Sequence, residues 1–528
     1  MSSPRLLQRF GGGALPLVTA TVVTLAGLVL TLMAWRGAFS SNMHTDPVVV
    51  YCAAGVMPAV RPVAEQYEAE FGIPIELISG SSGTLEAQIR SLEGVRSGDL
   101  YIPAAQDPFI DRNLVGGESS QETGQKPFIK EVIPLARFSL VLAVNPECEE
   151  KITSLDDLIG PQREVDFVIA NKQAAVGRKT REILESAGRW EEVRAAADQV
   201  ATVTEATALV DLGVAADAGF IWDANARQQG LHIVDLPELA AEPSLISVGV
   251  IASSTNPTGA LRFARYLAAP KKGQVSFKRL HYEPVQGDPW EPGIPEVVLF
   301  SGGVNRDAIE LTIAEFERRE GCKVQATFDG CGSLVASMNA GQDPDAYFAC
   351  DVSFLTMVED RFQTGVEVTD TDMVMLVRPG NPKGIRSIED LAREGIAFGI
   401  ADETKSALGK LSVDLLKSRG IYERAVKNRK LESPTAHFLI PQLTQSDALD
   451  AVIVYRANCH YIDSAAEIVP IDDPRASAVQ PFAVHQQAKY PQLTERLQKA
   501  ISSAKSRQRF EEFGFRWQLG GTREQESP

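Results

Sequence analysis

The chain has few of the residues on which most enzymes and metal proteins depend. It contains six cysteines and six histidines in 528 residues, and neither HExxH nor CxxC occurs. Cysteines this sparse do not form a disulfide scaffold, and the usual zinc motifs are missing. GxSxG, the signature of a serine nucleophile elbow, is also absent. We therefore expect no enzyme, no bound metal and no cofactor.

Positive charge is scarce as well. Asp and Glu number 69 against 52 Lys and Arg, which gives a net charge of −17. A nucleic-acid partner would need a basic footprint, so none is expected. Hydrophobic residues at 44% and charged residues at 23% are typical of a globular protein. At roughly 150 residues per domain, the length predicts two to four structural units.

One segment near the start has no charge at all. Between Arg9 and Arg36 no charged residue occurs, and Ala14–Trp35 is almost entirely apolar. About 20 apolar residues suffice to span a bilayer. A cleaved signal peptide is the alternative, although its apolar core would be only about 7–15 residues long. Either way the rest of the chain is exported. The expected segments are a cytoplasmic N-terminus (1–13), a transmembrane anchor or signal segment (14–35) and a linker (36–46).

From Pro47 onward the chain repeats itself. PVVVYCAAGVMPAV is followed by EVVLFSGGVNRDAI, and GSSGTL by GCGSLV, with Tyr51 matching Phe300 and Gly83 matching Gly332, each 249 residues apart. Later matches, such as SLDDL with SIEDL, have an offset of 233. A period this long indicates a tandem of whole domains rather than a solenoid. The predicted domains are a first repeat unit (47–286), a short stiff linker (287–295), a second repeat unit (296–520) and a tail (521–528).

Each copy alternates strands and helices. Val48–Ala53 is a continuous apolar run of the kind that a buried parallel strand shows. Val60, Val63 and Tyr67 then recur at helical spacing. This rhythm predicts an α/β fold with parallel sheets, in which ligands lie where strands end and helices begin.

Two loops in each copy occupy that position. In the first copy they are Cys52–Gly55 and Gly80–Thr84. Small residues let backbone N–H groups approach a ligand, and a helix N-terminus adds positive potential, so the loops suit an oxyanion. The alternative is that Gly and Ser only form turns and caps.

The same loops in the second copy are Ser301–Val304 and Gly330–Ser333. Cys331 stands where the first copy has Ser82. A thiol is a weak donor, and it is either a small filler or, at a helix start, a reactive group.

Two other features are open to more than one interpretation. Asp99 and Asp345 match between the copies at a junction between loop and strand. We expect them to cap or brace the lobes, with contact to an anion as the alternative. His437 stands alone, outside any recognisable motif, and is interpreted either as a polar loop residue or as a site residue.

The order of these segments over two copies resembles the extracytoplasmic molybdate-binding proteins of ABC importers, which have the type II periplasmic binding fold. The residues that carry the resemblance are the GSSGTL loop, SGDLYI and the late FIW and VIVY segments, within Pro47–His281 and Glu296–Gln518. The resemblance implies two tandem bilobed units that close on molybdate, tungstate or a related oxyanion. It also implies an ABC permease as partner and a position on the periplasmic side of the cytoplasmic membrane, where a single-pass anchor would hold the chain.

Carried over position by position, the resemblance implies a ligand site in each unit. In the first unit the site residues are Ala54, Gly55, Ser82, Val176, Gly177, Val203 and Trp222. In the second unit they are Gly303, Val304, Cys331, Gly332, Leu408, Gly409, His437 and Tyr455. Gly55 stands where the family has Ser and Trp222 where it has Tyr, whereas Tyr455 keeps the family residue. Because each unmet hydrogen bond costs about 1–3 kcal/mol, the second unit is either degenerate or tuned to another solute.

Two other classes of function remain as alternatives. A membrane-anchored sensing or interaction protein could use degenerate binding domains as scaffolds. An enzyme on this fold would have Cys331 as its best candidate nucleophile. The pairing of the six cysteines stays open, since six allow 15 complete pairings.

Overall fold

The computed structural model describes residues 46–92, 98–117, 124–161 and 163–519. The predictions for the N-terminus (1–13), the anchor (14–35), most of the linker that follows and the tail (521–528) lie outside the described residues. Within those residues, no helix combines the length and the apolar character that crossing a membrane requires.

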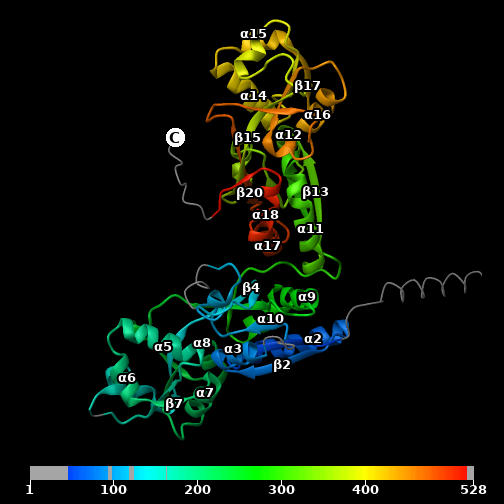
Figure 1. The fold of residues 1–528 in the computed structure, drawn as a ribbon. Helices are drawn as coiled ribbons and strands as arrows, with labels where there is room; N and C mark the ends of the chain where they lie inside the picture. Colours follow the sequence, from blue (N-terminus) through cyan, green and yellow to red (C-terminus); the bar gives the residue numbers. More distant parts are fainter. Residues whose placement is uncertain (1–45, 93–97, 118–123, 162, 520–528) are drawn as a thin grey trace, which may run out of the picture.

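The described chain folds as two bilobed units that meet at the middle of an elongated molecule (Figure 1). In each unit the chain starts in one lobe, crosses to a second and returns to the first. We call the lobe that holds both ends the frame lobe and the other the distal lobe. The two frame lobes lie against each other, and the distal lobes lie at the two ends of the molecule.

The first frame lobe is a sheet of six strands in the order β11-β4-β10-β3-β1-β2 with helices on both faces. Its elements are β1 (Val48–Ala53), α2 (Met57–Phe71), β2 (Ile75–Gly80), α3 (Ser82–Ser91), β3 (Leu100–Ile102), η1 (Asp111–Asn113), β4 (Ile129–Phe138), β10 (Ser244–Ile251), α9 (Pro257–Ala268), α10 (Gly273–Arg279) and β11 (Glu283–Pro284).

The first distal lobe has a sheet of five strands in the order β7-β6-β8-β5-β9. Its elements are β5 (Leu140–Val144), η3 (Pro146–Lys151), α4 (Asp156–Ile159), β6 (Phe167–Ala170), α5 (Ala175–Ser186), α6 (Trp190–Ala196), β7 (Asp198–Val200), α7 (Val203–Leu212), β8 (Ala218–Trp222), α8 (Asp223–Gln229), β9 (His232–Val234) and η4 (Pro237–Leu239).

The second unit repeats this plan, but one long strand, β15, passes from lobe to lobe and joins both sheets into one. Its frame lobe contains β12 (Glu296–Gly302), η5 (Gly303–Asn305), α11 (Arg306–Glu320), β13 (Lys323–Asp329), α12 (Cys331–Asn339), β14 (Ala346–Phe348), α13 (Val352–Thr356), η6 (Glu359–Arg361), β15 (Val366–Val377), β20 (Ser477–Val484), α17 (Pro491–Ile501), α18 (Ala504–Glu512) and β21 (Arg516–Trp517). Its distal lobe contains η7 (Ile388–Ala392), β16 (Phe398–Ala401), α14 (Ala407–Ser418), α15 (Tyr422–Asn428), β17 (Arg429–Ser433), α16 (Ala436–Thr444), β18 (Ala451–Tyr455), η8 (Arg456–Cys459) and β19 (Glu467–Pro470).

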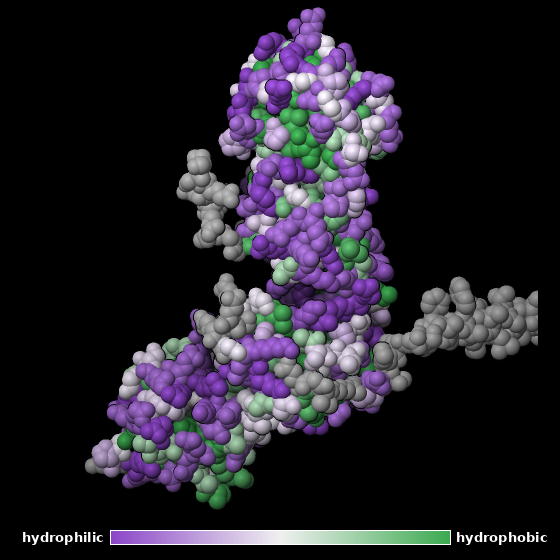
Figure 2. All heavy atoms as spheres, viewed as in Figure 1, coloured by the Kyte–Doolittle hydropathy of each residue, from purple (hydrophilic) through white to green (hydrophobic). Residues whose placement is uncertain are grey.

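The strand expected at Val48–Ala53 is confirmed as β1, whose six residues are all buried. It pairs in parallel with β2 and β3. The expectation of parallel sheets is confirmed for these strands but not for the whole sheet, because β10 pairs antiparallel with β3 and β4. The physical reason is the crossing between lobes: the strand that brings the chain back runs opposite to those that left. Each unit has its own hydrophobic core, and hydrophilic side chains cover much of the visible surface (Figure 2).

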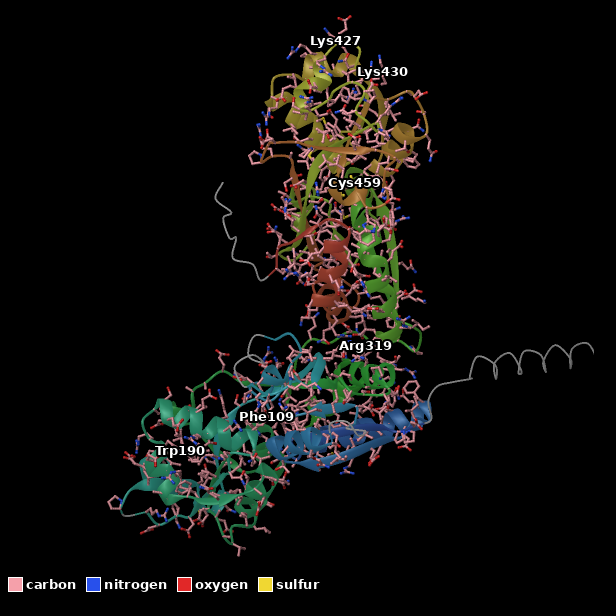
Figure 3. All side chains as sticks on the ribbon, viewed as in Figure 1. Phe109, Trp190, Arg319, Lys427, Lys430 and Cys459 are labelled. Atoms are coloured by element: carbon pink, nitrogen blue, oxygen red, sulfur yellow. The ribbon has the colours of Figure 1, made fainter. Side chains whose placement is uncertain are left out.

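The two frame lobes are joined by buried charge as well as by the linker. Glu320, which is 2% exposed, accepts hydrogen bonds from Arg265 of the first unit (3.0 Å) and Arg496 of its own unit (2.6 Å). Although burial alone would raise it, the two arginines hold the pKa of Glu320 below its ordinary value. Arg319, labelled at the junction in Figure 3, pairs with Glu131 of the first unit. The carboxylate of Asp288 accepts the amides at the start of α17 at 2.8 and 2.9 Å. The units are therefore fixed to each other through their frame lobes.

Candidate functional site

A small cavity lies between the lobes of the first unit, where the sequence places the ligand. Its volume is about 10 Å³, which is room for about one water molecule. Among the described residues that line it, none carries a charge. The lining residues are Ala53, Ala54, Gly55, Gly80, Ser81, Ser82, Ala104, Ala174, Ala175, Val176, Thr202, Val203 and Trp222. The structure thus brings six of the seven predicted first-unit residues together.

Three helices begin at this cavity. Ser81 caps α3 by accepting the Thr84 amide, and Thr202 caps α7 by accepting the Glu205 amide at 3.1 Å. The third helix, α5, begins at Ala175. The first amides of a helix have no acceptor within the helix, and the helix dipole makes this end positive. The Gly and Ser residues therefore do form turns and caps, and in doing so they direct neutral donors towards the cavity.

Trp222 forms one wall of the cavity at the end of β8. Its side chain is fully buried, and its ring stacks on Phe138 with centroids 4.1 Å apart. The indole Nε1 is buried and has no hydrogen-bond partner in the described structure. A buried donor without a partner costs about 1–3 kcal/mol, so an acceptor within reach of Nε1 would stabilise this wall of the cavity.

Gly55 is enclosed by both lobes. A Cβ at this position would lie 2.6 Å from Cγ1 of Val203 and 3.1 Å from Oδ1 of Asn225. Its carbonyl oxygen accepts hydrogen bonds from Asn225 at 3.1 Å and from the hydroxyl of Tyr282. In this closed arrangement the serine that the resemblance implies has no room, and only glycine fits.

The remaining predicted first-unit residue, Gly177, does not line the cavity. It lies in the first turn of α5, where a Cβ would be 2.2 Å from the carbonyl oxygen of Ala170. Its absent side chain therefore allows α5 to pack closely against the end of β6.

In the second unit the predicted residues lie at the corresponding places. Gly303 and Val304 follow β12, Cys331 and Gly332 begin α12, Leu408 and Gly409 lie in the first turn of α14, and Tyr455 ends β18. His437 lies in the first turn of α16 rather than in a loop. Its ring Cε1 lies 3.9 Å from the point that a Cβ of Gly303 would occupy, so it faces the first loop of the cleft.

Cys331 takes over the structural role of Ser82. The hydroxyl of Ser82 accepts the Ala104 amide at 3.1 Å, and the thiol of Cys331 accepts the Cys350 amide at 3.0 Å. Buried polar groups without a partner gather near this point. They are the hydroxyls of Tyr347 and Tyr455 and Oδ1 of Asn305. Burial, followed by the nearby Cys350, holds the pKa of Tyr455 well above its ordinary value, so its hydroxyl remains a proton donor.

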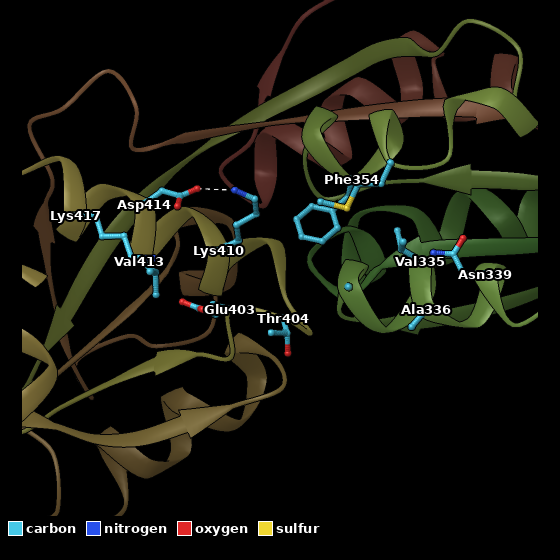
Figure 4. Close-up of a pocket in the computed structure, with 12 residues that line it drawn as sticks. Val335, Ala336, Asn339, Phe354, Glu403, Thr404, Lys410, Val413, Asp414 and Lys417 are labelled. Atoms are coloured by element: carbon cyan, nitrogen blue, oxygen red, sulfur yellow. Dashed lines mark hydrogen bonds and ion pairs between the residues drawn. The ribbon is translucent and has the colours of Figure 1, made fainter.

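A larger hollow opens between the lobes of the second unit, beside the cleft (Figure 4). Its volume is about 440 Å³. Of the predicted site residues only Gly332 lines it, and Figure 2 shows an apolar area between the two lobes of this unit. The other lining residues are Val335, Ala336, Asn339, Phe354, Met357, Glu403, Thr404, Lys410, Val413, Asp414 and Lys417. No motif in the sequence pointed to this hollow.

The matched aspartates brace the frame lobes, as expected. Asp99 accepts the Val49 amide at 2.9 Å, and Asp345 accepts the Val298 amide at 2.8 Å. Each carboxylate therefore ties the end of one loop to the first strand of its unit.

Sequence reasoning missed several residues that shape the two clefts. Asn225 and Tyr282 hold the Gly55 carbonyl, and Cys350 and Tyr347 adjoin Cys331. Asn225 matches Asn458 in the late segments FIWDANA and VIVYRAN, at the offset of 233, but neither residue was assigned a role at the site. Cys350 aligns with Ala104 at the same offset of 246 as Asp345 with Asp99, but neither residue was assigned a role at the site.

Comparison with known proteins agrees with this architecture. A family model described as bacterial extracellular solute-binding protein matches residues 48–279 and again 297–516. A Haemophilus influenzae protein named as a binding protein is 23% identical over 223 residues, which are 42% of this chain and 90% of that protein.

Solved structures of binding proteins match one unit at a time. The molybdate-binding protein of Azotobacter vinelandii is 20% identical, with a TM-score of 0.35 over 45% of this chain and all of that chain. The sulfate-binding protein SubI of Mycobacterium tuberculosis is 15% identical, with a TM-score of 0.37 over 43% of this chain and 88% of that one.

The family model covers most of the chain in two copies, and each copy coincides with one bilobed unit. Membership of this family makes the chain a binding protein rather than an enzyme, as the absence of nucleophile motifs predicted. The chain belongs to the bacterial extracellular solute-binding protein family and carries two copies of its binding unit.

Proposed function

We propose that the chain binds a small tetrahedral oxyanion, such as molybdate or tungstate, outside the cytoplasm and delivers it to an ABC permease. The single observation that carries the proposal is the buried, unpartnered Nε1 of Trp222 at the wall of a cavity where three helices begin. We further propose that residues 14–35 hold the chain to the cytoplasmic membrane as a single-pass anchor.

The chemistry of the first cavity suits an anion held by neutral donors. Helix-terminal amides, the caps and the indole N–H all present partial positive charge without a formal charge. A protein with a net charge of −17 repels anions at long range, so capture depends on these local dipoles. Raising the ionic strength should therefore change the affinity little, because none of the described residues that line the cavity carries a charge to be screened.

Admission of the solute requires the lobes to part. The first cavity has room for about one water molecule, which is less than an oxyanion occupies. Val203 lies on the distal lobe and Gly55 on the frame lobe, so rotation of one lobe from the other widens the cavity at this contact. In the second unit the buried hydroxyl of Tyr455 supplies a donor that has no partner among the described residues.

Isothermal titration calorimetry of the full chain with molybdate, tungstate, sulfate and phosphate tests the proposal. Trp222→Phe removes the indole donor and keeps most of the ring, and Tyr455→Phe removes the matching hydroxyl of the second unit. A hydrogen bond to a charged acceptor contributes about 1.5–3 kcal/mol, so each variant should weaken its own site by about tenfold or more. Absence of heat with all four anions would overturn the proposal.

A second candidate is a sensing or interaction protein whose binding units no longer hold a solute. The small first cavity and the contact between Val203 and Gly55 favour it. Widening the cavity by Val203→Ala distinguishes the two candidates. An oxyanion-binding protein should keep or gain affinity in this variant, whereas a degenerate unit should give no heat before or after the change.

A further inference from the structure

Two cysteines meet at the base of the second cleft, where the first unit has a serine and an alanine. Cys331 begins α12 and Cys350 follows β14, and both are buried as free thiols. Their counterparts Ser82 and Ala104 are joined by one hydrogen bond, from the Ala104 amide to the Ser82 hydroxyl. The second unit therefore differs from the first by two cysteines at positions that already touch.

The sulfur atoms of Cys331 and Cys350 both lie beside Gly302. A Cβ built on Gly302 would lie 2.2 Å from Sγ of Cys350 and 3.1 Å from Sγ of Cys331. The Cys350 amide donates to Sγ of Cys331 at 3.0 Å. The two cysteines are therefore in direct contact, which a disulfide between them requires.

A metal is a poorer explanation for the pair. In the described part of the chain, no group of three or more His, Cys, Asp or Glu side chains could hold a metal ion. Structural zinc needs four such ligands. The neighbouring polar groups include the hydroxyls of Tyr347 and Tyr455, which remain protonated because burial raises their pKa well above the ordinary value. They also include the carboxylate of Asp351, which accepts hydrogen bonds from Ser353.

We propose that Cys331 and Cys350 form a reversible disulfide, which gives the second cleft a redox-dependent structure that the first cleft lacks. The family acts outside the cytoplasm, where disulfides persist. The oxidant is a low-molecular-weight disulfide. The thiolate of Cys331 attacks it, forms a mixed disulfide and releases one thiolate. The thiolate of Cys350 then attacks the Cys331 sulfur and releases the second, and the two protons lost by the cysteines pass to the two released thiols.

Opening of the cleft controls access to the pair. Cys331 stands between Gly330 and Gly332, whose absent side chains bring this turn against Lys405 and Thr404 of the distal lobe. The Gly332 amide donates to the Lys405 carbonyl at 3.0 Å across the cleft. Closed lobes therefore cover the turn that holds Cys331, and separation of the lobes uncovers this turn. Oxidation then ties the end of β14 to the start of α12 and removes both S–H donors from the base of the site.

The test is mass spectrometry of the full chain, reduced and then treated with oxidised glutathione, followed by alkylation under denaturing conditions. We expect one pair of peptides linked through Cys331 and Cys350, lighter by two hydrogen atoms, with the other four cysteines alkylated. Recovery of both thiols in alkylated form, or glutathione on each of them without a link, would overturn the proposal. The measurement involves no solute, so its result tests the disulfide independently of the proposed function.

Two variants test whether the link is specific to Cys331 and Cys350. Cys459→Ser alters another buried cysteine of the second unit and should leave the link intact. The double change C331S/C350A installs the Ser82 and Ala104 pair of the first unit, so it should fold and show no linked peptide. A link between other cysteines in that double variant would show that the oxidation is not specific to this pair and would contradict the proposal.

Discussion

Two helices face each other across the cleft in both units, α3 and α5 in the first and α12 and α14 in the second, and their facing side chains differ. In the first unit Glu86 accepts hydrogen bonds from Arg90 at 3.3 Å and from Arg112. Arg178 of the distal lobe places its guanidinium 5.2 Å from the ring centroid of Phe109 in the frame lobe. Charged and aromatic groups therefore bridge the lobes.

The same face of the second unit is open and lined by apolar and charged side chains together. At the repeat offset of 249, Val335 occupies the position of Glu86 and Asn339 that of Arg90. Lys410 follows Gly409 as Arg178 follows Gly177, but it pairs with Asp414 on its own helix at 2.6 Å. The result is the hollow of about 440 Å³. Two units with the same strand order thus differ in what holds their lobes together, and each difference can be tested by a matched change in both units.

The largest loss of stability should come from a change at the junction of the two frame lobes. Glu320→Ala would leave Arg265 and Arg496 buried without their counterion, which costs about 3–5 kcal/mol. Urea unfolding of the full chain should show a lower midpoint. The control is Glu291→Ala, because the Glu291–Lys489 pair is half exposed at the same junction and should change the midpoint little. Equal midpoints for the two variants would show that the frame lobes do not depend on buried charge.

The next effect concerns the crowding around the second cleft's thiols. Gly302→Ala would force a methyl group against the Cys350 sulfur, and overpacking of this kind costs about 1–3 kcal/mol. The first unit has Ala53 at the corresponding position and Ala104 in place of Cys350. Adding Cys350→Ala should therefore recover much of the lost stability, measured by thermal unfolding. The same loss in both backgrounds would mean that the two units do not share this packing.

A smaller effect is expected from the bridge between the first unit's lobes. Arg178→Ala removes a cation–π contact that contributes about 0.5–2 kcal/mol, so the closed state should lose part of its population. Spin labels on the two lobes of the first unit report the opening as a longer distance distribution. Lys410→Ala is the matched change in the second unit, and it should leave that unit's distances unaltered because Lys410 pairs within α14. Opening of both units to the same extent would contradict the comparison.

The sequence predicted the elements of the fold better than the contacts between them. Apolar runs such as Val48–Ala53 mark buried strands, and the loops that directly follow such strands line the cavity of the first unit. The junction at Glu320 was not predictable, since its partners are distant in the chain and polar contacts leave no periodic pattern. The free donor of Trp222 was equally hidden. A tryptophan at the end of a strand is ordinary, and only the ring stack on Phe138 fixes where its N–H points.

One further difference between the units lies in the loop before α5 and before α14. In the second unit Asp402 accepts the Thr404 amide at 2.8 Å and its hydroxyl at 2.6 Å. In the first unit the neutral Asn171 accepts the Gln173 amide at 2.9 Å in the same way. Each loop supplies a carbonyl to the facing lobe, so its rigidity bears on the closure of its cleft.

The smallest expected effect is a pH dependence confined to the second cleft. The hydroxyl of Thr404 and nearby amides hold the pKa of Asp402 below its ordinary value. The carboxylate therefore stabilises the loop above the unfolded pKa of about 3.9, and this stabilisation is lost as the pH falls through the lower folded pKa. Amide exchange at Gly332, which donates to this loop, should quicken in acid relative to Gly83, which donates to the loop of Asn171. In the variant Asp402→Asn, amide exchange at the two glycines should depend on pH in the same way. If Gly332 and Gly83 lose protection equally in the unaltered chain, the charge of Asp402 does not distinguish the two clefts.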